Sequence, residues 1–197
     1  MSYQIITVSR MFGSGGRTIA HAVSERLGIP YYDRDLIEMV AEKTGFHPDY
    51  IEERGEHAPT KSPFAYAFIG RSAAGLSGDD ILWQAQCQVI RELSEKGPCL
   101  IVGRCADYLL RERTDALHVF VYADKEFRAD RIVRLYGESE DKPERRLDEK
   151  DKKRRINYNY YTCRNWGDPE NYHLMLNSGK LGIDTCTDLI VRTYRGE

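Results

Sequence analysis

Short runs of β-branched and apolar residues alternate along the chain with longer segments in which apolar residues recur every three or four positions. The short runs are typical of strands that a parallel sheet buries on both faces. The longer segments are typical of helices that bury one side. Strands are predicted over residues 4–9, 29–32, 99–102, 117–122 and 172–177. Helices are predicted over residues 18–27, 33–44, 47–56, 79–95, 105–111, 125–136, 154–161 and 185–194.

Strands that alternate with helices predict an α/β fold, in which helices cover a parallel sheet and the crossovers are right-handed. The length of 197 residues suits a single domain over residues 1–197. Residues 59–78 are rich in Pro, Gly, Ser and Ala, which indicates an irregular segment. Residues 137–153 are dense in charge, and we expect most of them to be solvated.

Composition narrows the function classes. A formal net charge of −2 indicates neither a nucleic-acid binder nor a membrane-surface protein. No apolar run approaches the roughly 20 residues that span a bilayer, and the first residues do not have the pattern of a signal peptide. The odd number of cysteines, without a C-x-x-C pair, favours reduced thiols and a cytoplasmic protein. They are Cys87, Cys99, Cys105, Cys163 and Cys186.

A glycine loop follows the first predicted strand. Glycines let backbone N–H groups turn toward one anion, and the N-terminus of the next helix adds partial positive charge. In the standard signature G-x-x-x-x-G-K-[ST], lysine contacts the outer phosphates and the hydroxyl holds Mg²⁺. We interpret this loop as a phosphate-binding loop; a turn that only connects strand to helix is the alternative. Its candidate binding residues are Gly13, Ser14, Gly15, Gly16, Arg17 and Thr18.

The loop departs from the standard signature at two positions. Met11 stands where the first glycine is usual, and Arg17 stands where lysine is usual. Arginine keeps the positive charge but presents a broad planar fork, which can bind a phosphate through two hydrogen bonds. Gly16 and Thr18 match the second glycine and the hydroxyl position.

Two aspartates follow the second predicted strand. Asp33 comes directly after the strand and is well placed for a metal ion, whereas Asp35 is equally well explained as a cap of the next helix. Further along the chain, basic and acidic residues alternate over residues 145–155. Most of these charges are explained by ion pairs on a solvated helix, but phosphoryl transfer also needs cations that reach the developing charge.

Taken together, residues 9–17, 31–35 and 100–104 resemble the cytidylate kinase-like family, within the P-loop nucleoside-monophosphate kinases. The resemblance covers nearly the whole chain. It implies a three-layer P-loop kinase fold with a five-stranded parallel sheet flanked by helices. It also implies a helical acceptor-binding insert at about residues 33–96 and an arginine-bearing lid at about residues 137–165.

The resemblance also implies roles for single residues. The glycine loop would cradle the phosphates of ATP, with Arg17 as a catalytic cation and Thr18 on Mg²⁺. Asp33 would act in catalysis and metal binding, and with Asp35 and Arg104 it would bind the acceptor. Arg104 would grip an acceptor monophosphate. The best matches to lid arginines are Arg154 and Arg155.

The predicted function is therefore ATP-dependent phosphoryl transfer, with Mg²⁺, to a pyrimidine nucleoside monophosphate such as CMP or dCMP. Two departures leave alternatives open. Cys105 stands where cytidylate kinases have aspartate, and their cytosine-reading residues do not map onto residues 62–78. The Asp33-Arg34-Asp35 spacing is similar to shikimate kinases, so a small hydroxylated metabolite is a second acceptor class. A nucleotide-binding protein without turnover is a third reading, and the sequence leaves a homodimer open.

Overall fold

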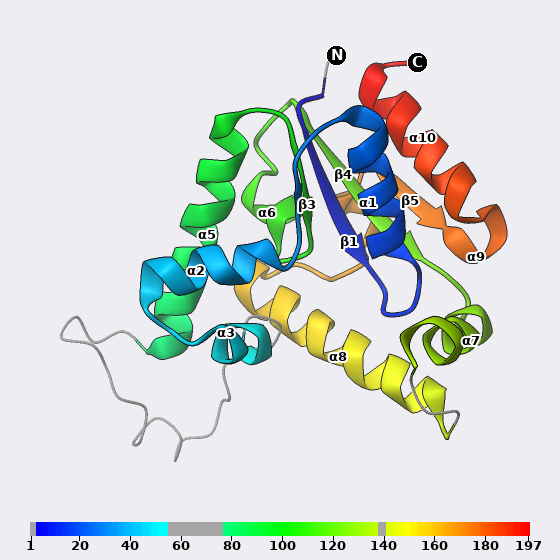
Figure 1. Ribbon diagram of the computed structural model, residues 1–197, viewed down its shortest axis with the longest axis horizontal. Helices are drawn as coiled ribbons and strands as arrows, with labels where there is room; N and C mark the ends of the chain where they lie inside the picture. Colours follow the sequence, from blue (N-terminus) through cyan, green and yellow to red (C-terminus); the bar gives the residue numbers. More distant parts are fainter. Residues whose placement is uncertain (1–2, 55–76, 138–140) are drawn as a thin grey trace.

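The computed structural model describes residues 3–54, 77–137 and 141–197, and its centre is a five-stranded sheet (Figure 1). The strand order is β2-β3-β1-β4-β5 and every pair is parallel, which confirms the predicted sheet. In the register, Ile5 pairs with Cys99 on one side and with Ala116 on the other. The strands are β1 (Ile5–Arg10), β2 (Tyr31–Tyr32), β3 (Cys99–Val102), β4 (Ala116–Tyr122) and β5 (Leu174–Asn177).

Helices cover both faces of the sheet. Side chains that point to either face of the strands are mostly apolar, so each face has to be shielded from water. Ile6 faces α1 (Gly16–Leu27) and α10 (Ile183–Arg195), where it packs in one buried cluster with Ile19 and Ile190. Ile5 faces the opposite way, into a second cluster with residues of α2 (Asp35–Thr44) and α5 (Gly78–Lys96). The strands are thus buried between two layers, and their carboxyl ends are left to form a site.

Further elements lie around this sandwich. They are α3 (Pro48–Arg54), α6 (Ala106–Leu109), α7 (Lys125–Tyr136), the 3-10 turn η1 (Pro169–Asn171) and α9 (Ser178–Leu181). Helix α6 is shorter than predicted, and α2 begins at Asp35 rather than at Asp33. The N-cap of α2 is Arg34, which makes no side-chain capping bond. In the described part of the chain, no helix is both long enough and apolar enough to cross a membrane.

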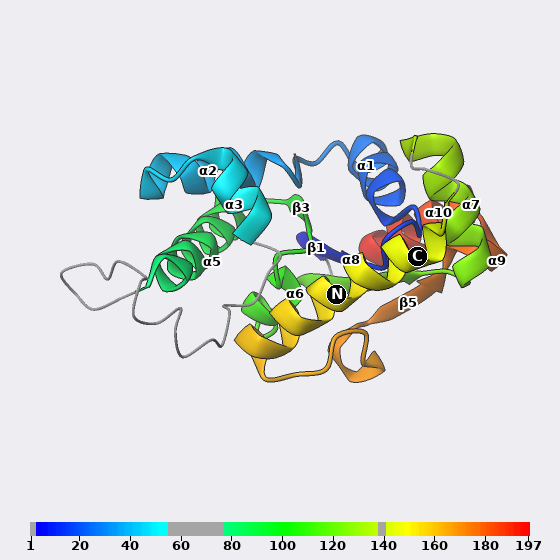
Figure 2. The same cartoon turned by 90° about the horizontal axis from the view of Figure 1, so that it is seen from below.

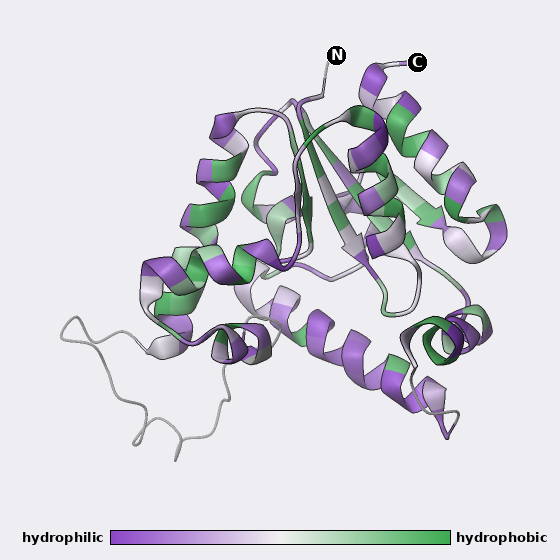
Figure 3. Cartoon of the chain, in the orientation of Figure 1, coloured by the Kyte–Doolittle hydropathy of each residue, from purple (hydrophilic) through white to green (hydrophobic). Residues whose placement is uncertain are grey.

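Helix α8 (Pro143–Thr162) begins earlier than the predicted helix, which starts at residue 154, although the charges of residues 145–155 already indicate a solvated helix. It runs across the carboxyl ends of the strands (Figures 1 and 2). Its surface is hydrophilic on nearly every side (Figure 3), so no apolar stripe marks it in the sequence. Of its 20 residues, those that are buried are Leu147, Asp151, Asn157, Tyr158 and Thr162, and most of them are polar.

Residues 59–76 of the predicted irregular segment lie outside the described residues. The end of that prediction is wrong, because Gly78 begins α5. Ser77 caps this helix: its hydroxyl accepts from the backbone N–H of Asp80, whose carboxylate accepts from the backbone N–H of Ser77. This reciprocal capping box satisfies two helix-end donors and sets the start of α5.

Candidate functional site

A cleft of about 750 Å³ opens where the glycine loop, the carboxyl ends of the strands and α8 meet. Its wall carries seven cationic side chains and three carboxylates. The cations are Arg10, Arg17, Arg34, Arg104, Lys150, Lys153 and Arg154; the carboxylates are Asp33, Asp49 and Glu52. This excess of positive charge favours an anionic ligand.

The glycine loop (residues 11–18) presents the N-terminus of α1 to this cleft. Helix α1 begins after Gly15, which has a φ of 77°, and no acidic residue lies in its first turn. No side chain caps this helix end, so its N–H groups and dipole remain available to an anion. Gly13 has a φ of 78°, and a Cβ there would lie 2.9 Å from the carbonyl oxygen of Arg128. Only glycine therefore fits this turn.

Arg17 and Asp33 lie side by side on the cleft wall and form an ion pair. The Arg17 guanidinium contacts both carboxylate oxygens, at 2.7 Å from Nε and 3.2 Å from Nη2. The Tyr31 hydroxyl donates to the same carboxylate at 3.4 Å. Burial, followed by the nearby Asp33 charge, raises the pKa of Tyr31 to about 12. The tyrosine is therefore a neutral hydrogen-bond donor near neutral pH, and Asp33 is held by two partners.

Thr18 also has a partner that sequence reasoning missed. Nη2 of Arg131, on α7, donates to the Thr18 hydroxyl oxygen at 2.9 Å. A Cβ on Gly15 would lie 3.3 Å from Nε of the same arginine. Arg131 thus lies over the start of α1, beside the residues proposed to bind phosphate.

Arg10, the last residue of β1, adds a buried cation between the glycine loop and the end of β3. Only 7% of its surface is exposed, and it lines the cleft. Its guanidinium packs against Gly103, where a Cβ would overlap it and where φ is 70°. Arg104, the residue after Gly103, lines the same cleft. The position of Arg10 at the carboxyl end of a strand was the sequence signal that could have found it.

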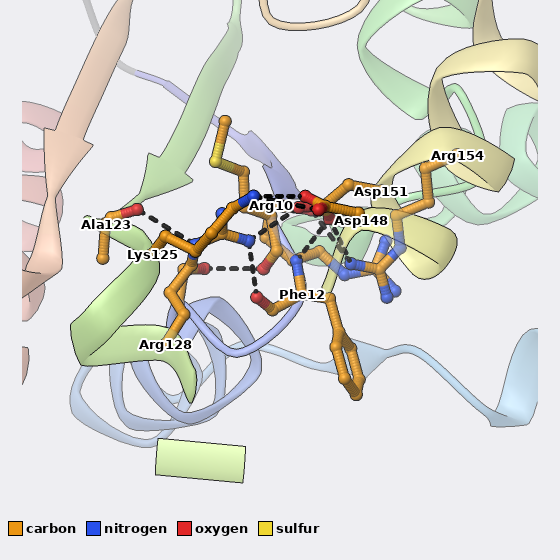
Figure 4. A network of polar contacts seen from close by, with 10 residues as sticks. Arg10, Phe12, Ala123, Lys125, Arg128, Asp148, Asp151 and Arg154 are labelled. Carbon is orange, nitrogen blue, oxygen red and sulfur yellow. Dashed lines mark hydrogen bonds and ion pairs between the residues drawn. The ribbon is translucent and has the colours of Figure 1, made fainter. Parts of the chain in front are cut away.

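A buried ion pair joins α8 to α7, and both of its side chains hold the glycine loop (Figure 4). Asp151 lies 2.6 Å from Arg128 of α7 and accepts the backbone N–H of Phe12 at 2.7 Å. Arg128 donates to the Phe12 carbonyl at 3.0 Å, so both backbone groups of Phe12 are held. One turn further along α8, Arg154 donates to the carbonyl of Arg10 at 3.2 Å. These contacts fix α8 against the loop.

Most of the residues predicted for the site lie together. Gly13, Gly15, Gly16, Arg17, Thr18, Asp33, Arg104 and Arg154 all line the cleft. Ser14, Asp35 and Arg155 do not line it. Ser14 is buried, and its hydroxyl donates to the Met11 carbonyl, so its side chain holds the loop itself. Asp35 and Arg155 are exposed on α2 and α8. Of residues 62–78, onto which the cytosine-reading residues of cytidylate kinases do not map, residues 62–76 lie outside the described part of the chain.

The model of the cytidylate kinase-like family matches residues 5–180. The chain belongs to this family. The match includes the glycine loop, Asp33, Arg104 and all of α8, which are the segments that form the cleft. A cytidylate kinase from Archaeoglobus fulgidus is 27% identical over 193 residues, which cover 95% of this chain and 92% of that protein.

Solved structures show the same fold as this family member. An uncharacterised protein from Eubacterium ventriosum has a TM-score of 0.73 at 26% identity, covering 98% of this chain and 99% of that one. Shikimate kinase from Acinetobacter baumannii, in complex with shikimate, has a TM-score of 0.54 at 16% identity, with coverage of 97% and 92%. A gluconokinase from Sinorhizobium meliloti has a TM-score of 0.55 at 16% identity, covering 100% of this chain and 92% of that one. The fold is therefore that of P-loop kinases.

Proposed function

We propose that this protein is an ATP-dependent kinase that phosphorylates a pyrimidine nucleoside monophosphate, CMP or dCMP. The observation that carries the proposal is a cationic cleft lined both by the start of α1 and by residues at the ends of two strands. The uncapped start of α1 and Arg17 face the cleft. Arg10, at the end of β1, and Arg104, two residues after β3, line it as well. These cations suit two phosphate groups that must come together for phosphoryl transfer.

A magnesium ion suits the oxygen donors on this cleft. Thr18 and Asp33 both line it, and Mg²⁺ typically takes one or two protein oxygens together with substrate phosphates and water. These two residues would hold the ion, which would neutralise charge on the transferring phosphoryl group. The Arg17 contact with Asp33 and the Arg131 contact with Thr18 would have to rearrange when both donors serve a metal.

In the proposed reaction the protein positions groups rather than forming a covalent bond. Backbone N–H groups at the start of α1 hold the donor phosphates, and Arg17 stabilises their developing charge. Arg104 and Arg10 hold the phosphate of the acceptor. That phosphate is already ionised near neutral pH, so no residue has to remove a proton from the attacking oxygen. Lys150, Lys153 and Arg154 on α8 line the same cleft and help to exclude water.

The test is ADP release from ATP and Mg²⁺ over a panel of CMP, dCMP, UMP, shikimate and gluconate. We expect turnover with CMP or dCMP. In Arg104→Ala, the KM for the monophosphate should rise by about 100-fold while the KM for ATP changes little, because a phosphate loses its charged partner. Arg111→Ala is the matched control, since Arg111 is an arginine of the same connection that packs over Tyr108 outside the cleft. Absence of turnover with every nucleotide would refute the proposed acceptor.

A kinase of a small hydroxylated metabolite is the second candidate. It is favoured by the position of Asp33 and Arg34, a carboxylate and a cation that line the cleft side by side. With a hydroxyl acceptor, Asp33 would have to accept the proton of the attacking oxygen. Turnover with shikimate or gluconate, lost in Asp33→Asn, would favour this candidate over the nucleotide kinase.

Nucleotide binding without turnover is the third candidate. It is favoured by the ion pair between Arg17 and Asp33, because in this pair each side chain is engaged by the other and not by a substrate. ATP binding without ADP release for any acceptor, in both the wild type and Arg17→Lys, would support it. Turnover that Arg17→Ala abolishes would exclude it.

A further inference from the structure

Asp107 is a buried carboxylate that the proposed reaction does not use. It lies in the first turn of α6, with 3% of its surface exposed. The Tyr158 hydroxyl donates to its Oδ2 at 2.6 Å, and the Ser9 hydroxyl donates to its Oδ1 at 3.3 Å. One side chain therefore joins α6, the end of β1 and the C-terminal part of α8.

Each of these three segments carries an arginine of the cleft. Arg10 follows Ser9 directly, Arg104 precedes Asp107 by three residues, and Arg154 precedes Tyr158 by one helical turn. The three arginines line the cleft, and they also line a small cavity of about 30 Å³ beside it, together with Ser9 and Tyr158. The distances among the three guanidinium groups thus depend on how these segments are joined.

The backbone that carries Arg104 needs such a support. Arg104 and Cys105 have φ values of 57° and 55°, in the left-handed region that side chains other than glycine rarely adopt. Residues held in this region persist where the surrounding structure fixes them. Asp107, anchored from two other elements, fixes the turn that follows this pair.

We propose that Asp107 is a positioning residue: its ionised carboxylate joins Ser9, the α6 turn and Tyr158, so that Arg10, Arg104 and Arg154 converge on one anionic group. The proposal rests on the proposed function only for the identity of that anion, a substrate phosphate. The joining itself is a property of the protein without substrate, and it can be tested without turnover.

The joining depends on pH. Burial raises the pKa of Asp107 to about 6, and the hydrogen bonds from Tyr158 and Ser9 limit that rise. The titratable groups that face it are Tyr158 from α8, Tyr172 next to β5 and the thiol of Cys105, all with pKa values raised by burial and therefore neutral here. The three arginines lie around the small cavity that Ser9, Cys105 and Tyr158 also line. A protonated Asp107 accepts more weakly, so the arginines should separate as the pH falls below about 6.

Sulfate is the probe, because its double negative charge does not change between about pH 5 and about pH 8. Its affinity is measured on the full chain from the NMR signals of the arginine Nε–H groups. In the wild type we expect the affinity to rise about tenfold across a midpoint near pH 6, within the usual range of coupling between two sites. In Asp107→Asn the affinity should be low and should not change across this midpoint. Asp115→Asn is the matched control, because Asp115 pairs with Arg113 away from the cleft.

Tyr158→Phe keeps the ring but removes one donor, so the midpoint of the sulfate affinity should move to higher pH. This variant also tests the proposal if Asp107→Asn does not fold. A midpoint that persists in Asp107→Asn, or that Tyr158→Phe leaves in place, would overturn the positioning role. If the acceptor panel gives no turnover, the proposed function fails, whereas these sulfate titrations still decide the role of Asp107.

Discussion

Replacing Asp151 by alanine should destabilise the protein strongly. The side chains of Asp151 and Arg128 are 9% and 7% exposed, and the substitution would leave the guanidinium buried without its carboxylate. Breaking such a buried pair costs about 3–5 kcal/mol of unfolding free energy. For a chain of this length each kcal/mol lowers Tm by about 2–4 °C, so the expected drop is about 6–20 °C.

Asp148→Ala is the matched control for this prediction. Asp148 lies one turn earlier on α8 and pairs with Lys125 of α7, but the two side chains are 63% and 50% exposed. Exposed pairs contribute less than about 1 kcal/mol because water and salt screen them. Unfolding is followed by circular dichroism in urea and by heating. An Asp151→Ala variant no less stable than Asp148→Ala would refute the assignment of α8 as a helix docked by buried charge.

The double variant Arg128→Met, Asp151→Ala separates the buried charge from other losses. Removing the arginine as well takes away the uncompensated cation, so the double variant should be destabilised by less than the sum of the two single variants. The recovery should be partial, since the carbonyls of Phe12 and Ala123 also lose a donor. Additive losses would mean that the two side chains act independently.

Three further predictions concern the cleft and the sheet. Arg154→Ala should weaken binding of the acceptor monophosphate in calorimetry by about tenfold or more, whereas Arg155→Ala, the exposed neighbour outside the cleft, should bind it as the wild type does. Gly103→Ala should lose about 1–3 kcal/mol of stability and shift the Arg10 Nε–H signal, because φ is positive and a Cβ would overlap that guanidinium; an unchanged signal would contradict this. Burial and the neighbouring His173 lower the pKa of His118 to about 4. Because this folded value lies below the unfolded one, the contribution of His118 to stability should fall by about 3 kcal/mol as the pH drops from about 6.5 to about 4. In His118→Asn the free energy of unfolding should fall less over this pH range than in the wild type. The folded pKa of Asp107 is raised, so its own contribution to stability should increase as the pH drops from about 6 to about 4.

Much of the fold and part of the candidate site follow from local sequence. The strands are recognisable because they are apolar on both faces, and the glycine loop because only glycine fits turns such as that at Gly13. Asp33 was found because a residue directly after a parallel strand lies at the edge where ligands bind, whereas Arg104 was predicted only from the resemblance to the cytidylate kinase-like family. These signals depend on a few neighbouring residues and on the order of strands and helices.

Tertiary structure alone decided the role of α8 and its partners. The helix is polar on nearly every side, and its buried residues Asp151 and Tyr158 are satisfied by Arg128, Phe12 and Asp107, which are 23 to 139 residues away in sequence. A solvated charged helix and one docked by buried charge have the same local pattern, because the difference lies in partners that only folding brings close. The sequence by itself determined a glycine loop at the end of a parallel strand, and the folded chain determined which of its many charges surround that loop.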